Sequence, residues 1–171
     1  APLSADAAYV AEEHDAAISE ALEPWAEEFV PRALTLLDHG TKPDKHNAGD
    51  GELLITTMRL FFAHISPALY DSALAKVARF VETNLFHNAL TPVGRFVEEC
   101  VHASPAKALD LLVPITASKL AADSGCSEEE ELCMLRVLSK AVKRAGAAIV
   151  PHKDYIGELL ARYICKEKHD V

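Results

Sequence analysis

The tripeptide Ser-Pro-Ala occurs twice in the chain, and each copy precedes a long stretch rich in alanine and leucine. The two copies are Ser66-Pro67-Ala68 and Ser104-Pro105-Ala106. Serine can accept hydrogen bonds from the free amides at a helix N-terminus, and proline suits the first turn, where its missing N–H is not needed. We therefore predict that a helix starts at each copy.

The spacing of these two helix starts predicts a stack of helix pairs. They lie 38 residues apart, at positions 66 and 104, which is close to the repeat length of about 40–47 residues in HEAT-type arrays. Arrays of this kind serve as surfaces and walls more often than as catalytic pockets. The expected fold class is all-α, an α-solenoid of HEAT-like antiparallel helix pairs.

Composition agrees with a folded helical protein and excludes several classes of partner. The chain has 171 residues, of which 50% are hydrophobic and only 7 are glycine, so it can form a core. Its net charge of −9 disfavours broad binding to the phosphate backbone of nucleic acids. No apolar run approaches the roughly 20 residues of a membrane span. We expect neither nucleic acid nor membrane as partner. The start at Ala1 rather than methionine suggests a fragment or a processed chain.

Apolar residues recur at helical spacing along the whole chain, and no segment alternates as a strand would. We predict about eight helices in four pairs, forming one HEAT-repeat fragment over residues 1–171. The predicted helices cover approximately residues 4–22, 25–39, 52–65, 67–86, 93–103, 105–120, 127–145 and 149–166.

Prolines, glycines and charges set the predicted boundaries. Pro24 is expected to end the first helix, because a proline disfavours helical geometry in the residue before it. Pro31 and Pro114 are expected to kink the helices that contain them. A long polar loop rich in glycine and turn-forming residues is predicted near residues 40–51. Ser127, followed by four glutamates, predicts a capped N-terminus.

Recognisable catalytic motifs are missing from the sequence. We find no phosphate-binding loop, dinucleotide fingerprint, zinc-protease motif or serine-hydrolase elbow. Adjacent acids point about 100° apart on a helix, so we interpret such pairs as solubility features; they are Glu12-Glu13, Glu27-Glu28 and Glu98-Glu99. The aromatic residues are interpreted as core. The only plausible anion contacts, Lys143-Arg144 and Lys166 with Lys168, are interpreted as charge complements at helix ends. We expect no enzyme activity and assign no catalytic, cofactor-binding or metal-binding residue.

The cysteines and histidines are scattered. Cys100, Cys126, Cys133 and Cys165 form no Cys-x-x-Cys pair, so we interpret them as structural thiols in a reducing compartment. His64 and His102 precede the two Ser-Pro turns, near predicted helix C-termini, where a protonated imidazole is favourable. A helical enzyme or metal protein that uses Cys126, Cys133 and histidines stays open as an alternative.

Between about Leu53 and Tyr155 the chain carries helix-packing patterns of a known family. The patterns are Leu69-Tyr70-Asp71, Ala73-Leu74-x-Lys76-Val77 and Phe80-Val81-x2-Asn84, followed by Cys100–Pro105 and Gly146–Asp154. The stretch from Phe61 to Phe86 resembles the middle region of the very large HEAT-repeat proteasome activators. These are proteasome activator complex subunit 4 of animals and its fungal and plant relatives.

The resemblance implies a non-catalytic segment of a single-chain solenoid that caps the core proteasome and modulates its gate. It implies two partners, the core proteasome through other parts of a parent chain and neighbouring repeats of the same chain. It also implies location in nucleus and cytoplasm. The family docks through a hydrophobic-tyrosine-x tail, which the ending Glu167–Val171 does not provide. The alternative is a generic HEAT or armadillo-type adaptor that binds a protein partner along its concave face.

Overall fold

The computed structural model describes residues 5–39 and 48–166, and this part of the chain is helical with no strand. Two short 3-10 helices, η1 (His87–Ala89) and η2 (Gly146–His152), accompany the α-helices. The α-helices are α1 (Ala5–His39), α2 (Ala48–His64), α3 (Pro67–Thr83), α4 (Leu90–Ala103), α5 (Pro105–Lys119), α6 (Glu128–Ala145) and α7 (Lys153–Lys166). The all-α prediction is confirmed.

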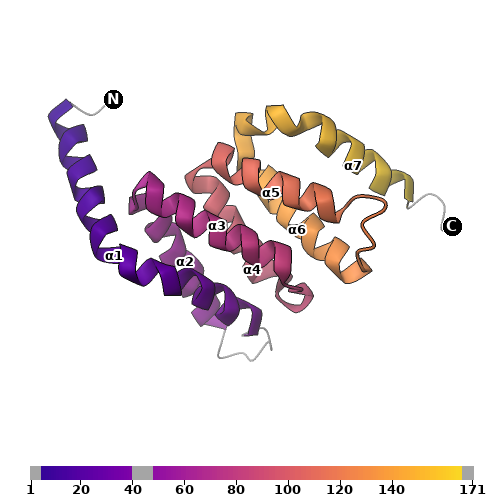
Figure 1. Cartoon of the computed structure of the whole chain (residues 1–171), viewed down its shortest axis with the longest axis horizontal. Helices are drawn as coiled ribbons and strands as arrows, with labels where there is room; N and C mark the ends of the chain where they lie inside the picture. The colour runs from indigo at the N-terminus through magenta and orange to yellow at the C-terminus, as the bar shows by residue number, and fades with distance from the viewer. Residues whose placement is uncertain (1–4, 40–47, 167–171) are drawn as a thin grey trace.

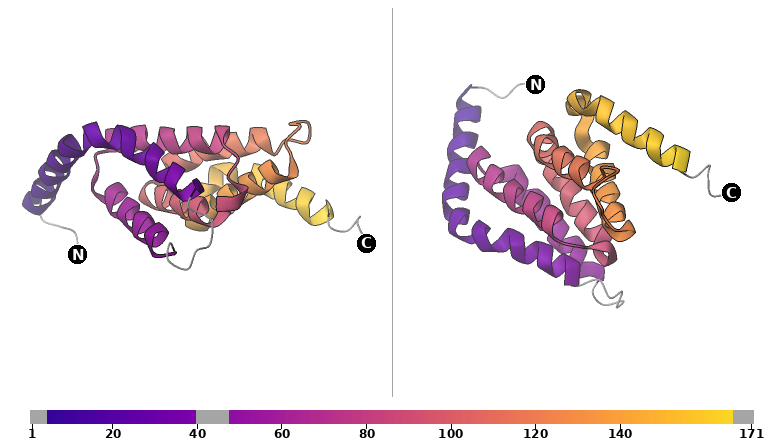
Figure 2. Two further views of the ribbon diagram at one scale, coloured as in Figure 1. Left: turned by 90° about the horizontal axis from the view of Figure 1, so that it is seen from below. Right: turned by 45° about the vertical axis from the view of Figure 1, so that its right-hand side comes forward.

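The helices form two layers of side-by-side rods. Helices α1, α3 and α5 lie in one layer, and α2, α4 and α6 lie in the other (Figures 1 and 2). Within each layer the middle helix packs against both of its neighbours, so that α3 lies between α1 and α5, and α4 between α2 and α6. Helix η2 then leads from α6 to α7 at one end of the stack. This is the arrangement expected of an α-solenoid built from helix pairs.

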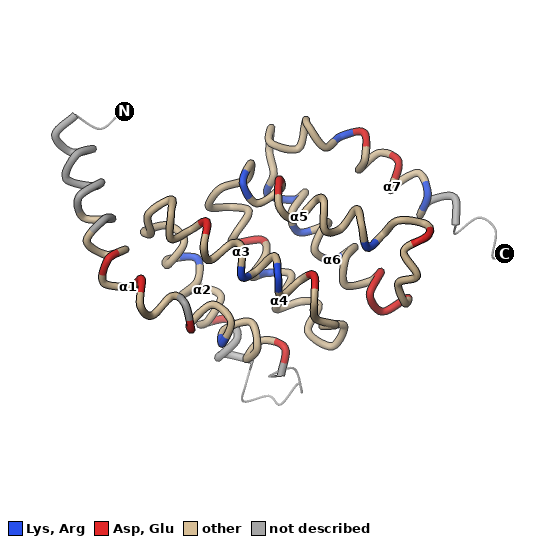
Figure 3. Tube along the Cα trace, in the orientation of Figure 1, with Lys and Arg blue, Asp and Glu red and all other residues tan. Residues whose placement is uncertain are grey.

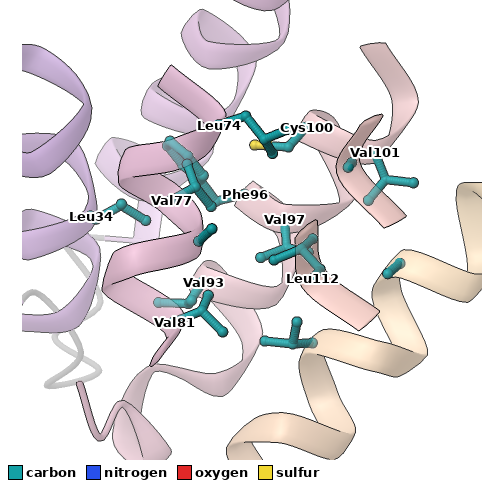
Figure 4. Packing of buried hydrophobic residues seen from close by; sticks show 14 of the residues in the cluster. Leu34, Leu74, Val77, Val81, Val93, Phe96, Val97, Cys100, Val101 and Leu112 are labelled. Carbon is teal, nitrogen blue, oxygen red and sulfur yellow. The ribbon is translucent and has the colours of Figure 1, made fainter. Parts of the chain in front are cut away.

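The hydrophobic core runs through the length of the stack. Figure 4 shows Leu74 and Val77 of α3, Phe96 of α4 and Leu112 of α5 converging between the layers, and all four are buried. Burying one such side chain contributes about 1.5–3 kcal/mol. Apolar contacts between helices of the two layers therefore hold the layers together.

Both Ser-Pro copies start a helix, as predicted, but only one serine caps it. Ser66 Oγ accepts a hydrogen bond from the Leu69 amide at 3.2 Å, and Pro67 is the first residue of α3. Pro105 likewise opens α5, whereas the Ser104 side chain makes no capping hydrogen bond. The prediction that the serine of each copy caps its helix is therefore wrong at Ser104.

Helix α6 begins and ends as its sequence predicts. The Glu130 amide donates to Ser127 Oγ at 3.3 Å, and the Ser127 amide donates to Glu130 Oε2 at 3.0 Å. This reciprocal pair satisfies two amides that the helix leaves free. Gly146 follows the last residue of α6 with a φ of 52°, a conformation that residues with a side chain rarely adopt.

Pro24 does not end the first helix. Residues Ala5–His39 form one helix of 35 residues that contains both Pro24 and Pro31 and bends visibly along its length (Figure 1). A proline removes one backbone hydrogen bond and crowds one carbonyl, which a long helix can accommodate by bending. Two predicted helices are therefore one, and seven α-helices are present in the described ranges instead of eight.

Other boundaries also differ from the sequence prediction, and α3 ends at Thr83 rather than near Phe86. Helix α2 begins at Ala48, so Ala48–Gly51 is helical although a loop was expected there. A glycine inside a helix costs about 1 kcal/mol relative to alanine, a cost that the packing of α2 against α4 outweighs. Residues 40–47 of that loop lie outside the described residues. Helix α4 begins three residues before Val93. Helix α7 begins at Lys153 because η2 occupies the preceding residues.

Candidate functional site

The described residues do not bring together the side chains that a metal ion would need. No group of three or more histidine, cysteine or acidic side chains in residues 5–39 and 48–166 is placed to hold a metal ion. Cys100 and Cys133 are buried, and Cys126 is partly exposed. Burial raises the pKa of Cys100 and Cys133, so these thiols are poor nucleophiles. The side chain of Cys165 lies outside the described part.

None of the helices in the described ranges is long and apolar enough to cross a membrane. His64 and His102 lie in the last turns of α2 and α4, so their predicted positions at helix C-termini are confirmed.

Glu98 is the acidic residue whose environment the sequence interpretation missed. It lies on α4 with a side chain only 8% exposed, and its carboxylate meets three cations of α6. Lys140 Nζ and Lys143 Nζ each lie 2.9 Å from a carboxylate oxygen, and Arg144 Nε lies at 3.0 Å. Burial by itself would raise the pKa of Glu98, but the hydrogen bonds from Lys140 and Lys143 lower it to about 2. Glu98 is thus an internal counter-ion, and its interpretation as a solubility feature is wrong.

The cations around Glu98 could have been found from their spacing. Lys140, Lys143 and Arg144 stand three and four residues apart, which places them on one side of a helix. On α4, Gly94 and Glu98 share a side in the same way. A Cβ at Gly94 would come within 3.2 Å of the Lys140 Cγ, so the glycine allows α6 to approach α4 closely. What the sequence does not reveal is that these two sides face each other.

Charged side chains also link helices of successive pairs within each layer. Arg95 of α4 holds the Glu52 carboxylate of α2 with two hydrogen bonds, one of them 2.7 Å between Arg95 Nη2 and Glu52 Oε1. Lys107 of α5 reaches both oxygens of Asp71 of α3, at 2.6 and 2.8 Å. Exposed pairs of this kind contribute little stability. Each of them joins a helix to the next helix of the same layer.

Two hydrogen bonds, one buried and one partly buried, connect the Ser-Pro turns to neighbouring helices. Tyr70 of α3 donates its hydroxyl proton to the Cys100 carbonyl at 2.8 Å, near the end of α4. The Ser66 amide donates to Ser19 Oγ of α1. Burial raises the pKa of Tyr70, so its hydroxyl remains a donor. Tyr70 belongs to the family-like pattern Leu69-Tyr70-Asp71, and its hydrogen bond joins α3 to α4.

The outer surface of α1 and α2 is less well covered than the middle of the stack. Trp25 is 49% exposed and stacks on Phe29, with ring centroids 4.0 Å apart. Phe29 in turn meets the edge of Phe61, which is buried. Leu53 and Leu60 of α2 are exposed as well. The interpretation of the aromatic residues as core holds for Phe61 but is wrong for Trp25.

Comparison with known proteins agrees with this architecture. The family model described as "Proteasome activator complex subunit 4, mid HEAT repeats region" matches residues 4–125. A curated relative from Arabidopsis thaliana, "Proteasome activator subunit 4", is 24% identical over 178 residues, covering 80% of this chain and 10% of that protein. The chain thus spans about a tenth of the length of the curated relative that it matches. No solved structure matches the chain.

That the repeat array occupies all of residues 1–171 stays a prediction, because the family model ends at residue 125. The resemblance of the Phe61–Phe86 stretch is confirmed by a match that covers well over half of the chain. This chain belongs to the proteasome activator complex subunit 4 family and corresponds to its mid HEAT-repeat region.

Proposed function

We propose that this chain is a non-catalytic scaffold segment of a HEAT-repeat activator that caps the core proteasome and modulates its gate. The observation that carries the proposal is the side-by-side packing of helix pairs in a chain of this family. Each pair is stabilised by its neighbours, and the core extends along the stack. A segment built in this way can form part of a wall.

The proposal explains why α1 and α2 expose apolar side chains. Helix α4 covers one side of α2, whereas Leu53 and Leu60, seven residues apart and therefore on one side of the helix, are exposed. Trp25 and Leu36 are exposed on α1. In the activator these side chains would pack against a neighbouring repeat of the same polypeptide. Contact with the core proteasome would then be made by other parts of the polypeptide, in nucleus and cytoplasm.

Native gel electrophoresis with a peptidase assay tests the proposal. The complete activator polypeptide containing this sequence is incubated with core proteasome, and a fluorogenic peptide is used to stain the gel. We expect the activator to shift the core proteasome to a slower band with altered peptidase activity. The isolated 171-residue chain, at equal molar concentration, is the control and should leave the band unshifted. No association of the complete polypeptide would overturn the proposal.

The exposed surface of α1 and α2 provides a second test. Isolated chains with uncovered apolar sides should associate with one another at high concentration. Replacing Leu53 and Leu60 by aspartate should suppress this association, as measured by light scattering. The control replaces Leu132 of α6 by aspartate. This side chain is also half exposed but lies on another part of the stack. Equal effects of the two changes would contradict the assignment of this surface.

A further inference from the structure

Around Glu98, the α4–α6 surface carries more positive charge than this one carboxylate neutralises. We call Arg136, Lys140, Lys143 and Arg144 of α6 the α6 cationic cluster. The last three surround Glu98 of α4. Three of these cations share the single carboxylate of Glu98, which leaves a surplus of two positive charges. Arg136 donates to neutral groups, the Leu90 carbonyl and the Thr91 hydroxyl. A local positive surface therefore exists in a chain whose net charge is −9.

Glu98 holds these cations in position before any partner arrives. Long side chains lose conformational freedom when they bind, which lowers affinity. Here folding has already fixed the Lys143 ammonium at 2.9 Å and the Arg144 Nε at 3.0 Å from the Glu98 carboxylate. Both side chains nevertheless reach solvent, with exposed fractions of 59% for Lys143 and 45% for Arg144. The cluster is thus both ordered and accessible.

The cluster retains hydrogen-bond donors that Glu98 does not use. Among the contacts of the described residues, Arg144 bonds to Glu98 through Nε, which leaves its two terminal nitrogens as a planar fork. Such a fork matches the two oxygens of a carboxylate. The Lys143 ammonium carries three N–H donors and directs one at Glu98. These groups suit an incoming carboxylate.

We propose that the α6 cationic cluster binds an acidic peptide segment of a partner protein. This inference goes beyond the scaffold function and does not depend on it. Acidic residues limit the length of the positive surface. The first turn of α6 consists of Glu128–Glu131, at the opposite end of the helix (Figure 3), and Glu52 and Glu99 lie on the adjacent helices. A long nucleic acid backbone would have to pass over these acids, which repel it. A short acidic segment can contact the cations alone.

Fluorescence anisotropy with a labelled hexaglutamate peptide tests the inference on the 171-residue chain. We expect saturable binding at low salt that weakens as salt is added, because the contacts are exposed and screened. Replacing both Lys143 and Arg144 by glutamate should weaken binding at least tenfold. The control replaces Arg79 of α3 and Lys153 of α7 by glutamate, which changes the net charge equally but away from the cluster. It should retain the affinity of the unchanged chain within about threefold.

Two results would contradict the proposal, and a third would assign the surface to another partner. Absence of hexaglutamate binding, or equal loss in the control variant, would overturn the assignment of the cluster. A labelled hexathymidylate is measured in parallel, and equal affinity for it with the same sensitivity to the Lys143 and Arg144 changes would assign the surface to nucleic acid. If the double glutamate variant lowers the melting temperature strongly, the same comparison is made with both residues replaced by glutamine.

Discussion

The middle of the stack and its outer helices are built from the same kinds of residue but bury them differently. In α3 and α4, the middle helices of the two layers, Val77 and Phe96 are completely buried, whereas Leu53 of α2 and Leu160 of α7 are 68% and 57% exposed. The middle helices have a neighbour on both sides within their layer, and the outer ones do not. The apolar pattern of a helix in a stack therefore indicates which side can be covered, and the neighbouring pair decides whether it is covered.

Replacing a large side chain by alanine should lower stability much more in the middle of the stack than in its outer helices, and this is the largest expected difference. We expect Phe96→Ala to lower the free energy of unfolding by about 3–5 kcal/mol, because it leaves a cavity in a packed core. Leu53→Ala should change it by less than about 1 kcal/mol, because this side chain is mostly exposed. Urea denaturation monitored by circular dichroism measures both. Equal losses would mean that the outer surface of α2 is packed as tightly as the middle.

The Glu98 cluster should make the middle of the stack sensitive to acid. The pKa of Glu98 is about 2 in the folded chain and near 4.5 when unfolded, so its contribution is present above pH 4.5 and is lost as the pH falls toward 2. We expect Glu98→Gln to lower stability at pH 7 by about 2 kcal/mol, less than the full shift implies, because Lys143 and Arg144 are partly exposed and screened.

Urea denaturation of both chains at pH 7 and at pH 2.5 measures this difference. The unchanged chain should lose most of its advantage over Glu98→Gln at the lower pH. An advantage that stays constant between the two pH values would contradict the assigned ion pair.

Removing the buried hydroxyl of Tyr70 should lower the free energy of unfolding by a smaller amount. Tyr70→Phe removes the donor to the Cys100 carbonyl while keeping the ring, and leaves a buried carbonyl without this partner. We expect a loss of about 1–1.5 kcal/mol in the free energy of unfolding. Tyr155→Phe on α7 is the comparison, because the Tyr155 hydroxyl meets the Thr116 side chain and no backbone carbonyl, so its removal should cost less. A larger loss at Tyr155 would reverse the expected order.

The two serines of the repeated tripeptide should show the smallest difference. Ser66→Ala removes a capping hydrogen bond and should cost about 1 kcal/mol. Ser104→Ala removes a side chain that makes no such bond, so its cost should be only a few tenths. Thermal melts of the two variants at one pH provide the comparison. Equal destabilisation would indicate that Ser104 also caps its helix in solution.

Features that depend on a few adjacent residues could be predicted from the sequence. The start of α3 at Pro67 and the capping box of α6 follow from local hydrogen bonding, and Gly146 ends α6 as its backbone freedom predicts. The family resemblance also rested on local packing patterns around Tyr70, and the family model confirms it.

Features that depend on contacts between distant residues could not be predicted. Pro24 favours a break locally, but α1 continues through it as one bent helix. Glu98 looks like an ordinary surface acid until α6 supplies its three cations, more than 40 positions further along the chain. Whether Trp25 is buried depends on what lies beside α1, which no pattern within α1 encodes.

Native-state hydrogen exchange tests most directly the claim that each helix depends on its neighbours for stability. Peptides from α4, which has a neighbour on both sides, should exchange only through global unfolding. Peptides from α7 and from α1 should exchange through local opening at lower free energy. Exchange of α1, α4 and α7 with one common free energy would contradict a stack stabilised pair by pair and would indicate a single cooperative globule.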